Sequence, residues 1–198
     1  MSLRLETVKG AALLPHVPAL ARLRGEVFAE WPYLYQSDAE AEARYLRQYV
    51  QGEGAAIILA RDGDAIVGAA TCQPMAGAHG PVRVAFTGAG HDPAEYAYFG
   101  ESVLLAVHRG QGAGVAFFAA REAHARSLGL RQATFCAVVR NVHDPRRPAT
   151  HTPLDGFWAR RGYTHHPELS CVFNWLELGD TKPTPHALSF WVKALDEP

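Results

Sequence analysis

The sequence has little that would suit nucleic-acid binding, membrane insertion or a disulfide framework. Its 19 Lys and Arg residues nearly balance 20 Asp and Glu residues, so the formal net charge is −1 at pH 7. This balance excludes the strongly basic surface expected of a nucleic-acid or anionic-membrane binder. The longest apolar runs, 55–60 and 115–120, are far too short to span a bilayer, and residues 1–6 lack the apolar core of a signal peptide. We therefore expect a cytoplasmic protein with a small ligand.

Cysteine is scarce, and the histidines lack the spacing of a metal site. Cys72, Cys136 and Cys171 are far apart, and each has strand-like neighbours. Buried free thiols in a reducing compartment are favoured over disulfides or a Cys-x-x-Cys site. None of the ten histidines forms a helical i, i+4 pair beside a carboxylate, so we predict no metal site.

The chain is long enough for one self-sufficient domain, which we place at 1–198. Periodicity and turn residues predict an alternation of strands and helices. The Pro- and Gly-rich stretch 74–94 is expected to be a loop or a weak edge strand, and the polar, Pro-rich stretch 142–155 is expected to be a loop insertion near a site. The predicted elements are a strand at 3–8, helices after Pro18 to 28 and at 38–49, a hairpin of 55–60 and 65–72, a strand at 96–107, a helix at 115–128, a strand at 135–139, a short helix at 157–161, and strands at 169–176 and 187–192.

A glycine-rich turn between the predicted strand 96–107 and helix 115–128 is the sharpest local signal. It reads Arg109-Gly110-Gln111-Gly112-Ala113-Gly114. Glycines allow the backbone to approach an anion, and a helix N-terminus offers free amides and a positive dipole end to a phosphate. The Walker and dinucleotide patterns do not fit, because they require a Lys or a glycine at places where this chain has neither. Taken alone, the turn fits a phosphate site and a plain tight connection about equally well.

The same six residues match the Arg/Gln-x-x-Gly-x-Gly/Ala signature of the GNAT family of N-acetyltransferases, and the order of elements resembles that fold. The segment Phe157-Trp158-Ala159-Arg160-Arg161-Gly162-Tyr163 is similar to a second, aromatic motif of the family. The resemblance implies an α/β (α+β) GNAT fold with a mixed, mostly antiparallel sheet of six to seven strands and about four helices. It also implies acetyl-CoA as the acetyl donor.

In the family, acetyl-CoA lies between splayed fourth and fifth strands. By resemblance, its pyrophosphate lies on Arg109, Gly110, Gln111, Gly112, Ala113 and Gly114, and its pantetheine runs along Leu104, Leu105 and Ala106. The register of the fourth strand is open, because either Leu104 or Val107 can occupy the position of the family's valine.

Acetyl transfer to an amine requires the neutral amine, so a base near the acceptor is valuable. Glu101, in Phe99-Gly100-Glu101-Ser102-Val103, resembles the catalytic glutamate of the histone acetyltransferase branch if Val107 sets the register. The Leu104 register places Tyr98 there instead. A solvated, non-catalytic glutamate is the alternative.

The tyrosine that often protonates the departing thiolate in the family is replaced by Trp158, which suggests a packing residue. Tyr163 or Tyr98 could act instead, or the acid could be dispensable. Trp31, Tyr33 and Tyr35 could form an aromatic wall for a cationic acceptor, or could be core residues. The leading hypothesis is an N-acetyltransferase acting on a small-molecule primary amine by direct attack, without nucleic acid or membrane partners. The alternative is a non-catalytic acyl-CoA-binding module, and a homodimer is left open.

Overall fold

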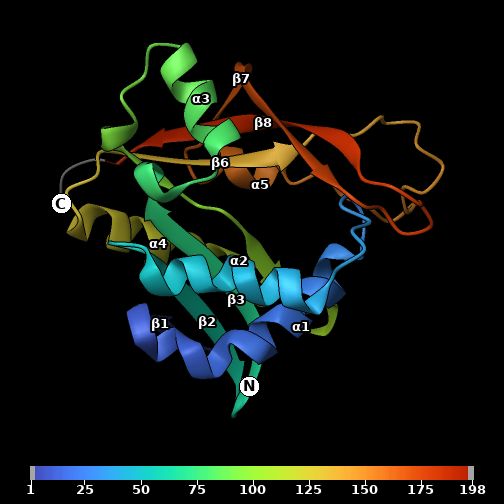
Figure 1. Ribbon diagram of the computed structural model, residues 1–198, viewed down its shortest axis with the longest axis horizontal. Helices are drawn as coiled ribbons and strands as arrows, with labels where there is room; N and C mark the ends of the chain where they lie inside the picture. Colours follow the sequence, from blue (N-terminus) through green and yellow to red (C-terminus); the bar gives the residue numbers. More distant parts are fainter. Residues whose placement is uncertain (1–2, 196–198) are drawn as a thin grey trace.

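A computed structural model describes residues 3–195 as an α/β fold around one sheet (Figure 1). The strand order is β1-β2-β3-β4-β6-β8-β7, with β5 paired to β3. Every pairing is antiparallel except that of β4 with β6. The predicted fold class is therefore confirmed, with eight strands where six to seven were expected. The strands are β1 (Arg4–Val8), β2 (Ala56–Asp62), β3 (Ala65–Pro74), β4 (Tyr96–Tyr98), β5 (Ser102–Leu104), β6 (Gln132–Val138), β7 (Thr164–Trp175) and β8 (Thr184–Ala194).

Helices cover both faces of the sheet. In Figure 1, α1 and α2 lie across β1, β2 and β3, and apolar side chains of both helices form a core with these strands. The opposite face packs against α4 and α5 through aromatic residues such as Phe117 and Phe118. No helix within residues 3–195 is long and apolar enough to cross a membrane. The α-helices are α1 (Val17–Phe28), α2 (Ala39–Gln51), α3 (Gly80–Gly88), α4 (Ala113–Ser127) and α5 (Asp155–Ala159).

Local signals fix the helices that the sequence predicts. Asp38 caps α2, since its Oδ1 accepts a hydrogen bond of 2.7 Å from the amide of Ala41. Gly129 follows the end of α4 with a φ of +74°, the left-handed conformation that commonly ends a helix. Both termini lie where the sequence pattern placed them.

The expectation of a loop or weak edge strand at 74–94 is wrong, because α3 occupies residues 80–88. Pro81 is in the first turn, where a proline costs no hydrogen bond. Val82 and Phe86, four residues apart, are fully buried and anchor the helix to the sheet. The flanking glycines concealed this two-turn apolar pattern.

The predicted strand 96–107 is also corrected, because it is interrupted and ends earlier. Residues 99–101 separate β4 from β5, and β5 ends at Leu104. Val107 lies in a 3₁₀ turn with 79% of its surface exposed. The last residue of the strand is thus Leu104 rather than Val107.

Residues 139–154, all of them described, contain turns but neither a helix nor a strand. Their proline content explains the irregular backbone. The two late strands, β7 and β8, are longer than expected and form a hairpin that carries the sheet beyond β6.

Candidate functional site

The sheet opens where β4 gives way to β5. β4 runs parallel to β6, and the last bond between them joins the amide of Phe99 to the carbonyl of Thr134 at 2.8 Å. After the break at 99–101, β5 pairs with β3 instead. β5 and β6 therefore diverge, as the resemblance implied for the fourth and fifth strands.

Backbone groups on both sides of this opening face each other without strand partners among the described residues. The amide of Leu105 donates to Val67 on β3 at 3.0 Å. Because strand residues alternate, the amides and carbonyls of Ser102 and Leu104 point the other way, toward β6. Leu104, Leu105 and Ala106 were expected along the pantetheine. Of these three, Leu104 directs its backbone groups toward the opening, whereas Leu105 bonds to β3 and Ala106 lies in the 3₁₀ turn.

The same alternation applies to β6. The carbonyl of Thr134 bonds to the β4 side, while the amide of Val139 donates to the carbonyl of Ala187 on β8 at 2.9 Å. Cys136 and Val138 consequently direct their backbone groups toward β5. Two parallel rows of amides and carbonyls without strand partners among the described residues suit an extended ligand that carries amide groups of its own.

The glycine turn leads from β5 into α4 and presents open amides. Gly110 and Gly112 have φ values of +77° and +86°, which glycine adopts at low cost. A Cβ at either position would meet no atom within 4 Å. The first intrahelical bond of α4 runs from the amide of Ala116 to Gly112. The amides of residues 113–115 therefore remain available to an anion.

Gly114 allows α4 and α5 to pack against each other. A Cβ there would lie 3.2 Å from the Phe157 ring of α5, so a glycine lets α5 pack closely on α4. Of the other turn residues, Gln111 donates to the carbonyl of Val107 at 3.4 Å. This bond holds the turn closed on itself.

Arg109 connects the turn to the end of α1. Its Nε donates to the carbonyl of Leu104 at 3.0 Å, and its Nη1 lies 2.7 Å from a carboxylate oxygen of Glu30. Both side chains of this ion pair are nearly half exposed. Arg109 can therefore turn to an anion on the turn without leaving a buried charge behind.

Glu101 lies in the break itself, and its side chain is buried rather than solvated. Its carboxylate forms an ion pair with Arg24 of α1, which also pairs with Glu42 of α2. Two groups fix the carbonyl of Glu101: the amide of Thr71 on the neighbouring strand β3 donates to it at 3.0 Å, and Arg121 of α4 donates to it at 3.3 Å. The break is therefore a defined structure with a carboxylate at its centre.

Tyr98, the alternative base, precedes the break and points into the core. Its hydroxyl lies 3.3 Å from the Cys136 thiol, and burial raises the pKa of Tyr98 well above its ordinary value. A phenol that stays protonated can donate a hydrogen bond but cannot act as a base near neutral pH.

Tyr163 and Trp158 belong to an aromatic cluster on the α4 face. The Tyr163 hydroxyl donates to Glu122 at 3.1 Å, and burial raises the pKa of this phenol. Trp158 packs edge-on against Phe135 and Trp191, with ring centroids 5.1 and 5.2 Å apart. The structure therefore does not bring these two side chains together with Glu101.

Trp31, Tyr33 and Tyr35 lie in the loop between α1 and α2, but only Tyr35 reaches the Glu101 cluster. Burial and a hydrogen bond with Glu42 raise the pKa of Tyr35 to about 12. Tyr33 packs on Phe28, with ring centroids 4.7 Å apart, and burial raises its pKa as well.

A second ion cluster, centred on Glu177, fastens this loop to the segment after β6. Glu177 is buried and pairs with Arg140 at 2.5 Å and with Arg146. Arg140 also donates to the carbonyls of Pro32 and Tyr33, at 2.5 and 2.9 Å. The loop 31–35 and residues 140–146 therefore form one connected rim beside the opening.

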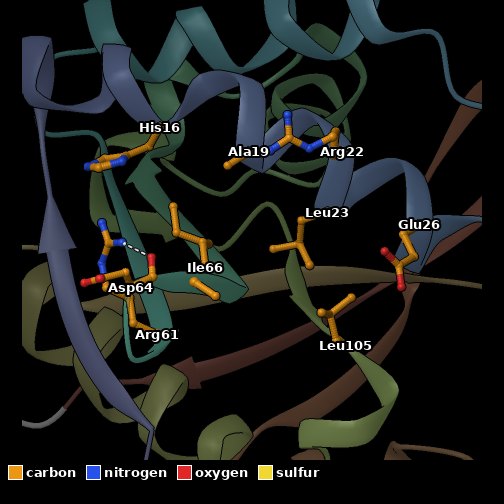
Figure 2. Close-up of a pocket in the computed structure, with 10 residues that line it drawn as sticks. His16, Ala19, Arg22, Leu23, Glu26, Arg61, Asp64, Ile66 and Leu105 are labelled. Atoms are coloured by element: carbon orange, nitrogen blue, oxygen red, sulfur yellow. Dashed lines mark hydrogen bonds between the residues drawn. The ribbon is translucent and has the colours of Figure 1, made fainter.

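An open pocket of about 450 Å³ lies between α1 and the β2–β3 hairpin. Figure 2 shows the side chains that line it. Arg22, Glu26 and Arg61 line it, and Arg61 donates to the carbonyl of Asp64 at 3.1 Å. Leu105 is its single member among the predicted site residues. The pocket therefore lies apart from the Glu101 cluster.

Sequence reasoning missed Arg24 and Glu42, although both left a signal. Arg24 follows Leu20 by four residues on the apolar face of α1, and Glu42 precedes Leu46 by four residues on the apolar face of α2. A charge placed on a buried helix face requires a partner. Two residues of opposite charge on the apolar faces of consecutive helices therefore indicate the ion pair of Arg24 and Glu42.

Comparisons with known proteins agree with this geometry. The family described as "Acetyltransferase (GNAT) family" matches residues 20–152. No match was found among curated protein sequences.

Solved structures show the same fold. A ribosomal-protein-alanine N-acetyltransferase from Brucella melitensis is 15% identical, with a TM-score of 0.65 over 98% of this chain and 100% of that chain. An N-acetyltransferase from Staphylococcus aureus Mu50 is 11% identical, with a TM-score of 0.64 over 99% and 100%. The PaiA N-acetyltransferase from Thermoplasma acidophilum, solved in complex with coenzyme A, is 11% identical, with a TM-score of 0.59 over 98% and 99%. The chain therefore belongs to the GNAT acetyltransferase family, whose acetyl donor is acetyl-CoA.

Proposed function

We propose that this chain is an N-acetyltransferase that transfers the acetyl group of acetyl-CoA to the primary amine of a small molecule by direct attack. One observation carries the proposal: the anion-accepting turn at 109–114 and the buried carboxylate of Glu101 stand at the two ends of the same short strand, β5. A donor extended along β5 would therefore bring its reactive end to Glu101.

The residues present fit such a donor. The free amides of residues 113–115 and the exposed guanidinium of Arg109 would hold a pyrophosphate. The backbone groups of Ser102, Cys136 and Val138 and the amide of Leu104 have no strand partner among the described residues and would hold the pantetheine amides. The carbonyl of Leu104 accepts from Arg109 instead. When bound, acetyl-CoA supplies an activated thioester carbonyl.

Glu101 would act on the acceptor. An alkylamine with a pKa of about 10.4 is an ammonium at pH 7, and neutralising it costs about 4.6 kcal/mol. A carboxylate at the break can take that proton, after which the amine nitrogen bonds to the acetyl carbon as the carbon–sulfur bond breaks. The second N–H proton that the nitrogen loses passes to water or to the departing thiolate. A positioned base typically contributes about 10² to 10⁴ in rate.

The departing thiolate needs little help from an acid. A thiol with a pKa of about 8.5 leaves passably as a thiolate near neutral pH. Trp158 is an aromatic packing residue, and the hydroxyls of Tyr98 and Tyr163 are engaged with Cys136 and Glu122. We therefore propose that no tyrosine acid is required.

The rim formed by loop 31–35 and residues 140–146 would select the acceptor. Tyr35 joins it to Glu101 through Glu42 and Arg24. We further propose that residues 1–198 form one domain with residues 142–155 as an insertion. A nucleic-acid or membrane partner is not part of the proposal, and a homodimer remains compatible with it.

The test is the release of free thiol from acetyl-CoA over a panel of primary amines, with the N-acetyl product identified by mass spectrometry. Thiol release that depends on the amine supports the enzyme. Saturable binding of acetyl-CoA without transfer to any amine would instead support the alternative, a non-catalytic acyl-CoA-binding module.

A further inference from the structure

A buried ion cluster surrounds the carboxylate of Glu101. The guanidinium of Arg24 lies between the carboxylates of Glu42 and Glu101, and the three side chains are 11%, 3% and 8% exposed. Two aromatic rings, Phe28 and Tyr45, cover the guanidinium, with ring centroids 5.1 and 4.2 Å from its central carbon. Such a group has few alternative partners, because its surroundings are apolar or already paired.

The cluster holds two carboxylates and one guanidinium, so its formal charge is −1. Within residues 3–195, the other groups that face the cluster do not supply a second cation. From the loop 31–35, the phenol of Tyr35 bonds to Glu42. From the segment before α3, His79 stacks on Tyr45, and burial lowers the pKa of His79, which favours its neutral form.

The cations on neighbouring elements are engaged elsewhere. Arg121, from α4, reaches the backbone carbonyl of Glu101 rather than its carboxylate. Arg140, after β6, pairs with Glu177. The net negative charge of the cluster is therefore uncompensated, which is costly inside a protein. A further cation bound next to the proposed base, Glu101, would compensate it.

We propose that Arg24 and Glu42 are positioning residues for Glu101: Arg24 holds the carboxylate ionised and fixed at the break, and Glu42 shares the guanidinium so that one net negative charge remains to receive an acceptor ammonium. The proposal rests on the proposed function and narrows the acceptor to amines that arrive as cations. The ammonium completes the cluster, its N–H bond breaks as an O–H bond forms on Glu101, and the neutral amine is left to attack.

Opposite effects of two substitutions test this arrangement. The pH at which Glu101 takes up a proton is measured by ¹³C NMR of the labelled side-chain carboxyl, assigned with Glu101→Gln, in the chain without acetyl-CoA. An arginine within about 4–6 Å typically lowers a carboxyl pKa by about 1–3 units, and a second carboxylate raises it. The protonation midpoint should therefore rise by about 1–3 pH units in Arg24→Gln and fall in Glu42→Gln.

The matched control is Glu40→Gln, because Glu40 lies on the same helix, is 90% exposed and pairs with Arg44 on the surface. It should leave the midpoint where it is in wild type. Arg24→Lys keeps the charge and should keep the midpoint nearer to wild type than Arg24→Gln does. If Arg24→Gln does not fold, the test is the protonation midpoint of Glu101 in Glu42→Gln, which should be lower than the midpoint in Glu40→Gln. Equal midpoints in these two variants would then overturn the proposal.

Kinetics give a second reading. With a protonated primary amine that proves to be an acceptor, Glu42→Gln should raise KM about tenfold or more with little change in kcat, whereas Glu40→Gln should change neither. Equal midpoints in wild type, Arg24→Gln and Glu42→Gln would overturn the proposal. Absence of acetyl transfer in the wild-type chain would count against the proposed function, while the NMR midpoints would still report on the cluster.

Discussion

Replacement of Gly112 by aspartate tests the assignment of the turn. Gly112 is the N-cap of α4, and its φ is +86°. Gly112→Asp adds a carboxylate at the position where we place the pyrophosphate. The new side chain would point into open space, since no atom lies within 4 Å of a Cβ at position 112. The substitution should therefore affect anion binding far more than folding.

The magnitude follows from two terms. An L-residue in the left-handed region costs about 1–2 kcal/mol, which lowers the free energy of unfolding by that amount and leaves the chain folded. Two like charges about 4–6 Å apart repel by about 3–4 kcal/mol at an effective dielectric constant of 20. The affinity for acetyl-CoA should thus fall by about 10² to 10³ at low salt.

Calorimetric titration with acetyl-CoA measures the affinity, and urea unfolding measures stability. Gly90→Asp is the matched control, because Gly90 has a φ of +81° and an equally open surrounding; it should lose similar stability and no affinity. Gly112→Ala carries the backbone cost without the charge, so its affinity should fall less than tenfold. A folded Gly112→Asp with wild-type affinity would refute the reasoning.

Three further substitutions address the base, the turn and the rim. Glu101→Gln should lower turnover by about 10² or more without weakening acetyl-CoA binding, and its deficit should shrink between about pH 7 and 10 as the free amine becomes abundant; a deficit that stays constant with pH would show that Glu101 only positions the acceptor. Glu30→Gln should raise the affinity for acetyl-CoA by up to about fivefold, because it frees Arg109 from an exposed pair that is worth about 0.2–1 kcal/mol; unchanged titration curves would contradict this. A hydrogen bond from Arg146 lowers the pKa of Asp144 to about 2, so its stabilisation is present above about pH 4 and lost toward pH 2. In wild type, the urea concentration at the unfolding midpoint should therefore fall between about pH 4 and pH 2. In Asp144→Asn this dependence on pH should be weaker, and an equal dependence in both proteins would count against the pair of Asp144 and Arg146.

The sequence predicted the elements whose causes are local. The cap at Asp38, the turn at 109–114 and the helix that follows each depend on neighbours within a few residues, and each lies where it was expected. α3 was missed because the Pro and Gly residues that begin and end it are also the residues of loops.

The break at 99–101 could not be predicted from the strand pattern. Its causes are distant in sequence: Thr71 on β3 and Arg121 on α4 hold the carbonyl of Glu101, and the hydroxyls of Tyr49 and Thr71 would lie 2.6 and 2.8 Å from a Cβ at position 100. An apolar run of residues gives no sign of such contacts. The same applies to Glu101, whose burial depends on a partner 77 positions earlier in the chain.

The most direct test of the account is a crystal structure with acetyl-CoA bound. We expect the pyrophosphate on the amides of residues 113–115, the pantetheine between β5 and β6, and the thioester at the break beside Glu101. A donor seated elsewhere, for example in the pocket of Figure 2, or bound with its thioester away from Glu101, would contradict the assignment of both the turn and the base.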